Sequence, residues 1–333
     1  MSGEPVLPWQ QELWSGLVDA RAKGRLTHAL LLAGPLGVGK RHFARVLAAS
    51  LLCESVDAQG YACGRCRGCV QFASGTHPNL HWVQVLQDEK TGKDKRDISI
   101  DQLRELSARL ALSSHYGGAK VAVIDPADVM NVAGVNALLK TIEEPPPNTH
   151  LVLISERPMA LAATLRSRCQ RLRFVAPAEA EARAWLQVEE PALPAEALAL
   201  AGGAPLKALD FHRSGLLALQ AQWRRDWFDV WSQKKTPVAA ATSIGRDRDQ
   251  AAAWLSALVV FLAEILRLCV AGDTRGEQGA IAARVSVNGL QQLIDEALES
   301  QRRLRSNAPP QQLAESLMIA WWRWAMTRPA ARA

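Results

Sequence analysis

Residues 31–41 read LLAGPLGVGKR, an apolar run followed by a glycine-rich turn and the start of a helix. The spacing G-x-x-x-x-G-K is typical of a loop in which backbone N–H groups and a helix N-terminus hold phosphate while the lysine adds a positive charge. The next position departs from this pattern, because Arg41 stands where a serine or threonine hydroxyl would hold magnesium. The stretch therefore predicts a nucleotidase fold that has lost hydrolysis. The phosphate-loop candidates are Gly34, Gly37, Gly39 and Lys40.

A second part of the catalytic set is also altered. Residues 120–125 read KVAVID and predict a buried strand that ends in Asp125, an acid placed where magnesium coordination is expected. The next residue is Pro126 instead of the glutamate that would act as base. Because two independent parts are missing, we expect no ATP hydrolysis by this chain. Binding of ATP or ADP without hydrolysis stays open, and a tight turn that binds no ligand is the alternative interpretation.

Strand and helix patterns alternate through the first half of the chain. Strands that alternate with helices predict a parallel sheet with helices on both faces and ligands at the carboxyl ends of the strands. From Pro177 onward the strand signal stops and the remainder is helical in character. We therefore place domain boundaries near 176 and 211. The expected strands are 29–34, 80–85, 120–125 and 150–155.

Four of the six cysteines are clustered in the sequence and give the spacing C-x9-C-x2-C-x2-C. Four thiolates in one loop suit tetrahedral zinc, and a closed shell of four sulfurs leaves no position for water. We therefore predict a structural zinc site, with buried free thiols or a redox pair as the alternatives. The predicted ligands are Cys53, Cys63, Cys66 and Cys69.

Length and composition describe an ordinary protein of 333 residues, which is enough for two or three domains. The net charge of +6 is compatible with a nucleic-acid-facing assembly but is shared by many other proteins. The polar N-terminus resembles neither a secretory signal nor a transit peptide. The longest apolar stretch, 251–263, is shorter than the roughly 18 residues of a membrane span. We expect a cytoplasmic protein in which this stretch is a buried helix.

Two further features have competing interpretations. Trp223, Trp227 and Trp231 lie four residues apart, which favours packing of one helix against another over a stacking platform for single-stranded nucleic acid. In the segment LRSRC, Arg168 could reach a nucleotide bound by a neighbouring subunit and stabilise transition-state charge in trans. From position alone, a solvated surface arginine is the favoured reading of Arg168.

Taken together, five stretches resemble the AAA+ clamp-loader family of bacterial DNA polymerase III. They are HALLLAGPLGVGK, ACGRCRGC with the upstream Cys53, GTHPNLHWV, VNALLKTIEEPPPNT and ATLRSRCQRLRF. The missing loop hydroxyl separates the chain from the ATP-hydrolysing gamma or tau members. In this respect the chain resembles the delta-prime members. The resemblance implies a RecA-like AAA+ domain at 1–176 with a zinc module at about 53–69. A helical lid domain at 177–210 and an all-helical collar domain for oligomerisation at 211–333 follow.

The resemblance also implies a role for the chain and for single residues. Ser167, Arg168 and Cys169 match a motif whose arginine acts as a finger toward ATP on the adjacent subunit, while Ser155 and Lys207 take the first and second sensor positions. The implied protein has no independent catalysis but is a subunit of a DNA polymerase holoenzyme and its clamp-loader ATPase. Its partners would be gamma/tau and delta subunits in a hetero-pentamer, the sliding clamp transiently, and primed DNA through the complex.

Two other functions remain as alternatives at this point. The first is an active gamma-like clamp-loader ATPase, which the altered loop opposes. The second is a zinc-dependent DNA-binding module, which would lose its DNA affinity on chelation.

Overall fold

A computed structural model describes most of the chain, and it divides into two compact units that we describe separately. The described residues are 4–87, 95, 97–114, 118–242, 244, 248–305 and 308–326. The first unit comprises Met1–Pro191 with Gly203–Lys207, and the second comprises Ala192–Gly202 with Ala208–Ala333. The division into three domains at 176 and 210 stays a prediction.

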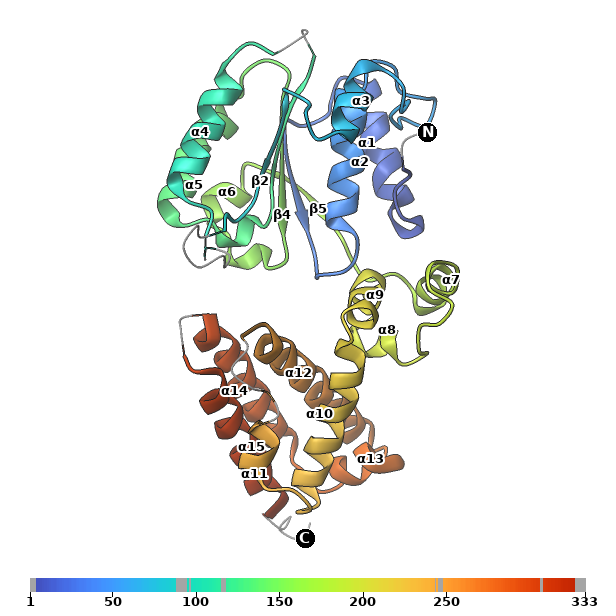
Figure 1. The fold of residues 1–333 in the computed structure, drawn as a ribbon, viewed down its shortest axis with the longest axis vertical. Coiled ribbons are helices and arrows are strands. Elements are labelled where there is room, and N and C mark those ends of the chain that lie inside the picture. Colours follow the sequence, from blue (N-terminus) through green and yellow to red (C-terminus); the bar gives the residue numbers. More distant parts are fainter. Residues whose placement is uncertain are drawn as a thin grey trace. The chain divides into compact units, whose positions relative to one another are not determined.

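The first unit is built on a five-stranded parallel sheet, which confirms the predicted fold class (Figure 1). Its order is β2-β3-β4-β1-β5, so the strand that leads into the phosphate loop lies inside the sheet. The strands are β1 Ala29–Ala33, β2 Leu80–Val83, β3 Lys120–Ile124, β4 Thr149–Ser155 and β5 Gln170–Arg173. Sequence patterns predicted the first four strands, whereas β5 was not predicted.

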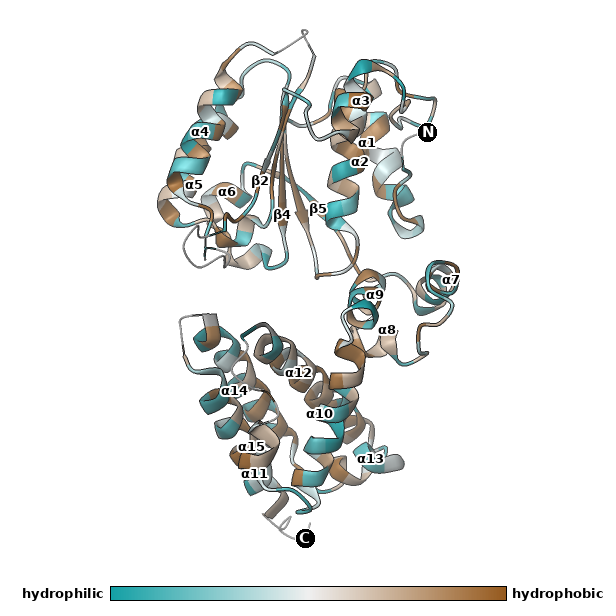
Figure 2. Ribbon diagram, in the orientation of Figure 1, coloured by the Kyte–Doolittle hydropathy of each residue, from teal (hydrophilic) through white to brown (hydrophobic). Residues whose placement is uncertain are grey.

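Helices cover both faces of this sheet. Leu30 and Leu32 of β1 point into a core with α1 and α2, whereas Leu31 and Ala33 point into a core with α4, α5 and α6. All four side chains are buried because side chains alternate between the two faces of a strand. Figure 2 shows the resulting apolar strands between more polar helices. The bounds are α1 Gln11–Ala22, α2 Lys40–Leu52, α4 Ile100–Ala111, α5 Val132–Glu143 and α6 Ala163–Arg166.

Shorter elements complete the first unit. The helix α3 contains Cys69, the last cysteine of the cluster, and α7 follows the last strand. The α4 helix begins at the predicted capping box, where the Ser99 hydroxyl accepts a 3.3 Å hydrogen bond from the Gln102 N–H. The bounds are α3 Arg67–Ala73 and α7 Glu179–Glu189, with 3-10 turns at Pro8–Gln10, Ala127–Val129 and Pro158–Ala160.

The second unit is helical in its described residues. Its core contains the tryptophan stripe of α10, with Trp223 and Trp227 each 1% exposed. The indole N–H of Trp321 donates a 2.9 Å hydrogen bond to the Trp227 carbonyl. Packing, rather than base stacking, is therefore the role of this stripe. The helices are α8 Ala197–Leu200, α10 Leu216–Trp231, α11 Pro237–Thr242, α12 Arg248–Ala271, α13 Gly276–Ala282, α14 Val287–Arg305 and α15 Pro310–Met326, with α9 Pro205–Arg213 crossing the division between the units.

The helix α12 is the central helix of that core. By length and composition its segment Gln250–Ala271 could cross a membrane, a test that core helices of soluble proteins also pass. Here Leu255, Leu258, Leu262 and Ile265 are buried among the neighbouring helices. The apolar composition is thus explained by packing, as predicted for this stretch.

Candidate phosphate loop and cysteine site

The phosphate loop connects β1 to α2 and depends on glycine at two positions. Gly37 and Gly39 have φ angles of +79° and +92°, in the left-handed region that favours glycine. Gly39 is also the N-cap residue of α2. The loop backbone is therefore that of a strand-to-helix turn at the carboxyl edge of the sheet, where the sequence placed it.

The lysine of the loop is turned inward. Lys40 is 5% exposed, and its ammonium donates hydrogen bonds of 2.7 and 2.5 Å to the carbonyl oxygens of Gly34 and Pro35. Burial lowers the pKa of Lys40. In this arrangement the loop's own carbonyl oxygens accept hydrogen bonds from the lysine ammonium.

Two other segments pack directly on the loop. A Cβ added to Gly39 would lie 2.4 Å from Leu7, and one added to Gly37 would lie 2.4 Å from the Cβ of Lys207. The Leu206 N–H donates a 3.0 Å hydrogen bond to the Gly37 carbonyl. The second-sensor candidate Lys207 therefore lies against the loop, where burial lowers its pKa.

Arg41, the residue that breaks the loop pattern, has a specific partner. Its Nε donates a 2.6 Å hydrogen bond to Oδ2 of Asp125, whose side chain is fully buried. Asp125 follows directly after β3 and is the carboxylate expected to coordinate magnesium. The guanidinium thus stands at the position expected to carry the magnesium-binding hydroxyl, and it also pairs with the acid expected to bind magnesium. Sequence reasoning identified both residues but did not predict that they pair.

A second acid, Asp128, fixes the end of β4. It accepts hydrogen bonds of 2.6 Å from the hydroxyl of Ser155 and 2.6 Å from the backbone N–H of Glu156. Ser155, the first-sensor candidate, is fully buried and held by this contact. Asp128 was missed by the sequence analysis. A signal was present, because an acid just after the Asp125-Pro126 turn lies at the same sheet edge as the end of β4.

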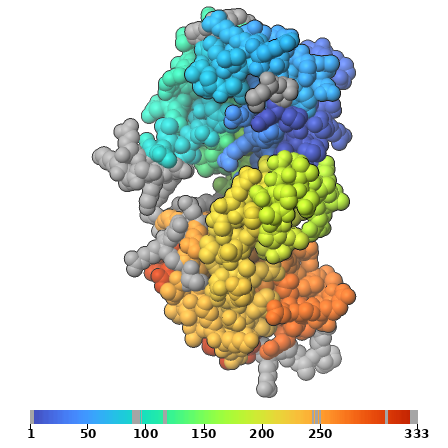
Figure 3. Space-filling view, turned by 45° about the vertical axis from the view of Figure 1, so that its right-hand side comes forward, coloured from blue at the N-terminus to red at the C-terminus, as the bar shows by residue number. Residues whose placement is uncertain are grey.

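The four cysteines of the cluster come together at the start of α3. Their sulfur atoms all lie within 4.8 Å of one another, and the pairs Cys53–Cys66 and Cys63–Cys69 are each 3.9 Å apart. A tetrahedral zinc with Zn–S bonds of about 2.3 Å requires sulfur atoms about 3.8 Å apart. The cluster can therefore hold a metal ion. In Figure 3 this module, in sky blue, forms a lobe at the surface of the first unit.

Backbone groups around the cluster favour thiolate at one position. Hydrogen bonds from the N–H groups of Arg65 and Cys66 lower the pKa of Cys63 to about 6. Burial instead raises the pKa of Cys53 and Cys69. Such N–H···S contacts are the outer partners expected around a sulfur-ligated metal.

Arg168, the finger candidate, lies just before β5. Its Nε donates a 2.5 Å hydrogen bond to the carboxylate of Glu143 on α5, and Nη1 donates one of 3.0 Å to the Thr164 carbonyl. The Arg168 side chain remains 39% exposed. Cys169 beside it is buried, which raises the pKa of its thiol to about 11 and makes it an unreactive packing residue.

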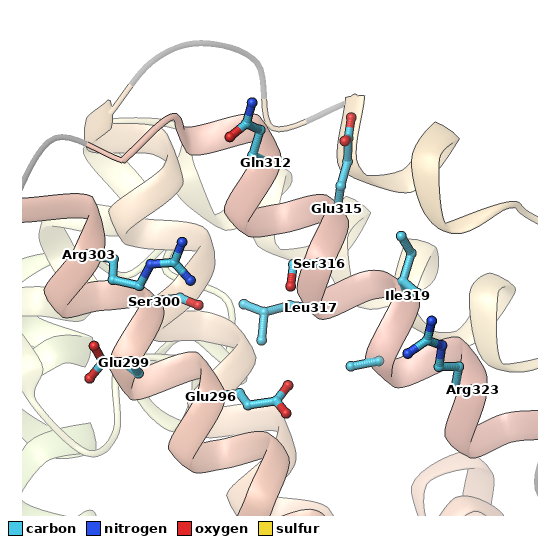
Figure 4. Close-up of a pocket in the computed structure, with 11 residues that line it drawn as sticks. Glu296, Glu299, Ser300, Arg303, Gln312, Glu315, Ser316, Leu317, Ile319 and Arg323 are labelled. Atoms are coloured by element: carbon cyan, nitrogen blue, oxygen red, sulfur yellow. The ribbon is translucent and has the colours of Figure 1, made fainter.

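A separate groove lies between α14 and α15 in the second unit (Figure 4). It encloses about 640 Å³ and carries side chains of both signs. Glu296 and Glu299 come from one wall, while Glu315 and Arg323 come from the other. Because opposite charges lie in one groove, it offers no concentrated charge to a small ion.

A known protein family matches most of the first unit, including its motifs. A sequence profile of the family described as "DNA polymerase III, delta subunit" matches residues 9–178. The chain belongs to this family. The matched region contains the phosphate loop, the cysteine cluster and Arg168, and it ends just after β5.

Individual proteins named DNA polymerase III subunit delta' are also similar to this chain. The chain is 42% identical to DNA polymerase III subunit delta' of Pseudomonas aeruginosa over 221 residues, which cover 65% of this chain and 64% of that protein. It is 40% identical to the Escherichia coli K12 protein of the same name over 208 residues, or 61% and 59% of the two chains. The chain thus spans less than two thirds of the length of these two relatives.

The fold extends to more distant proteins. A DNA polymerase III gamma subunit-related protein from Thermotoga maritima superposes with a TM-score of 0.51 at 14% identity, covering 95% of this chain and 99% of that one. This likeness shows a shared fold across both the sheet and the helical remainder.

Proposed function

We propose that this chain is a non-hydrolysing subunit of the DNA polymerase III clamp loader, which helps to place the sliding clamp on primed DNA. The observation that carries the proposal is the pair between Arg41 and Asp125, at 2.6 Å with the carboxylate fully buried. Magnesium-dependent hydrolysis needs a hydroxyl and a carboxylate free to hold the metal. In this chain Arg41 stands in place of the hydroxyl and is bound to the carboxylate of Asp125. An active gamma-like ATPase is therefore the weaker alternative.

In this proposal Arg168 supplies the finger for ATP bound by an adjacent subunit. It is exposed enough to reach outward, and its contact with Glu143 holds the guanidinium in place before a nucleotide is met. A guanidinium placed against the transferring phosphate stabilises the charge of the transition state. The Glu143 carboxylate would release the arginine to a group of greater negative charge.

The assembly follows from the same proposal. Relatives carry the names of delta-prime and gamma/tau subunits, which supports a complex with related chains. We propose a cytoplasmic hetero-pentamer with gamma/tau and delta subunits, a transient contact with the clamp, and DNA contact through the complex. Residues 1–176, 177–210 and 211–333 would be the AAA+, lid and collar domains, with the collar holding the ring together.

We further propose that the four-cysteine cluster holds structural zinc. Cys53, Cys63, Cys66 and Cys69 would be its ligands, and the sulfur separations of 3.9 Å support that geometry. The ion would cross-link the segment between α2 and α3, where no long apolar run is available. Binding would thus contribute folding free energy and no chemistry.

The finger is tested in a reconstituted clamp-loader complex with hydrolysing partner subunits. Arg168→Ala should lower DNA-stimulated ATP turnover, because a finger arginine is worth about 10³ to 10⁵ in rate at the single site it serves. Arg166→Ala is the matched control, since Arg166 lies on the adjacent α6 turn and is outside the finger motif. Equal turnover in the two variants would contradict the finger assignment. A normal thermal midpoint of Arg168→Ala verifies that folding is intact.

A further inference from the structure

A second hollow lies beside the phosphate loop but is not lined by it. It encloses about 600 Å³ at the edge of the first unit, and its wall combines cations with aromatic rings. The phosphate-loop residues from Gly34 to Lys40 are absent from its lining. The side chains that matter here are Arg41, Arg45, Phe72, Trp82, Gln84 and Asp125.

The fold explains why these side chains share one face. Arg41 and Arg45 are four residues apart on α2, so they lie on one side of that helix. Trp82 lies in β2 and Gln84 follows the end of that strand, and both residues line the hollow. Trp82 pairs with Val123 of β3, and Asp125 follows directly after the end of that strand. The hollow is thus a built feature, bounded by one helix face and two strand ends.

The charge of the hollow is positive. Asp125 is the acid among its lining residues, and it is already neutralised by Arg41. Arg45 is exposed and makes no ion pair among the residues that the structure describes. Its guanidinium lies 6.0 Å from the centre of the Phe72 ring. A cation without a carboxylate partner, next to an aromatic ring, is suited to an anion attached to a flat group.

The ring of Trp82 supplies the second part of such a site. Its indole N–H is buried and has no hydrogen-bond partner among the described residues, whereas Trp14 donates a 2.9 Å bond to the Gln59 carbonyl. A tryptophan usually finds a partner for this group when it is buried. Trp82 is only partly buried as a whole and lies in the wall of a hollow, so its ring is presented without being fixed by a hydrogen bond.

We infer that this hollow binds a nucleotide unit, with the base against Trp82 and Phe72 and the phosphate against Arg45. The exposed amide of Gln84 offers both a donor and an acceptor to the edge of a base. An acidic peptide would match the cations but would leave the two rings unused. The unit could be a free nucleotide or part of a nucleic-acid strand, and the test separates these sources. The inference does not depend on the proposed clamp-loader role.

The test measures binding to the purified full-length chain at low salt. A short fluorescein-labelled single strand of DNA is followed by anisotropy, and radiolabelled dAMP by equilibrium dialysis. Trp82→Leu should weaken binding roughly 5- to 100-fold, the range of one base–aromatic stacking contact, while Trp82→Phe should retain most of it. Arg45→Glu should weaken binding severalfold more than Arg104→Glu, a matched charge reversal at an exposed position of α4.

Each of the following outcomes either supports or overturns the inference. Binding of both probes with these losses indicates a free-nucleotide site, and binding of the strand alone indicates a nucleic-acid site. The inference is overturned if the wild-type chain binds neither probe. It is equally overturned if Arg45→Glu and Arg104→Glu weaken binding alike, or if Lys40→Ala abolishes binding that Arg45→Glu leaves intact. Circular dichroism verifies that Trp82→Phe is folded, so this variant still tests the inference if Trp82→Leu fails to fold.

Discussion

Removing Arg41 should destabilise the first unit, because it leaves the Asp125 carboxylate buried without a counter-charge. The Asp125 side chain is fully buried, its second oxygen has no hydrogen-bond partner among the residues that the structure describes, and the contact with Arg41 is 2.6 Å long. Breaking a fully buried pair costs about 3–5 kcal/mol, but Arg41 is 56% exposed and part of its field is screened. We therefore expect Arg41→Ala to cost about 2 kcal/mol, or about 4–8 °C in the unfolding midpoint.

Thermal unfolding followed by circular dichroism measures this effect. Lys23→Ala is the control, since Lys23 forms an ion pair of 2.8 Å with Asp19 that is largely exposed, and its loss should leave the midpoint within error. Asp125→Asn combined with Arg41→Ala should recover part of the loss, because the amide carries no charge. If Arg41→Ala and Lys23→Ala have the same unfolding midpoint, the pair of Arg41 and Asp125 does not stabilise the fold and the reasoning is refuted.

Three further predictions concern metal, pH and backbone. Purified protein should contain about one zinc per chain, and Cys66→Ser should lower both the zinc content and the protection of the module from proteolysis; a wild-type chain without metal would contradict this. Burial lowers the pKa of His150, so the unfolded chain takes up a proton more readily and stability should fall as the pH drops below about 6.5. The stability of His150→Gln should fall less over this pH range. An equal fall in the variant and the wild-type chain would contradict the prediction. Gly37→Ala should cost about 2–4 kcal/mol, since the residue has a φ of +79° and its Cβ would meet Lys207 at 2.4 Å; an unchanged denaturation midpoint would show that the loop is not packed as described.

The sheet was predictable where a strand is buried on both faces. The strands β1, β3 and β4 are continuous apolar runs, and such runs are typical of central parallel strands. The strand β5 was missed because it lies at the edge of the sheet and only Leu172 of its four residues, QRLR, is buried. Its position beside β1 is set by the pairing of Leu31 with Arg171, which no local pattern reveals.

The residues of the site were more predictable from the sequence than the contacts between them. Cysteine spacing indicated the cluster because all four cysteines lie within one short segment. The pairing of Arg41 with Asp125 joins residues 84 positions apart, and it arises because α2 packs across the sheet over β3. The contact of Lys207 with Gly37 likewise depends on tertiary packing. Sequence patterns identify which groups are altered, but the fold decides which of them meet.

ATP turnover by the purified chain tests the central claim most directly. With magnesium and saturating ATP, and with no partner subunit present, the account predicts no release of phosphate by the wild-type chain or by Arg41→Thr, since the base is also missing. Steady turnover that is lost in Lys40→Ala, and therefore belongs to this loop, would contradict the account.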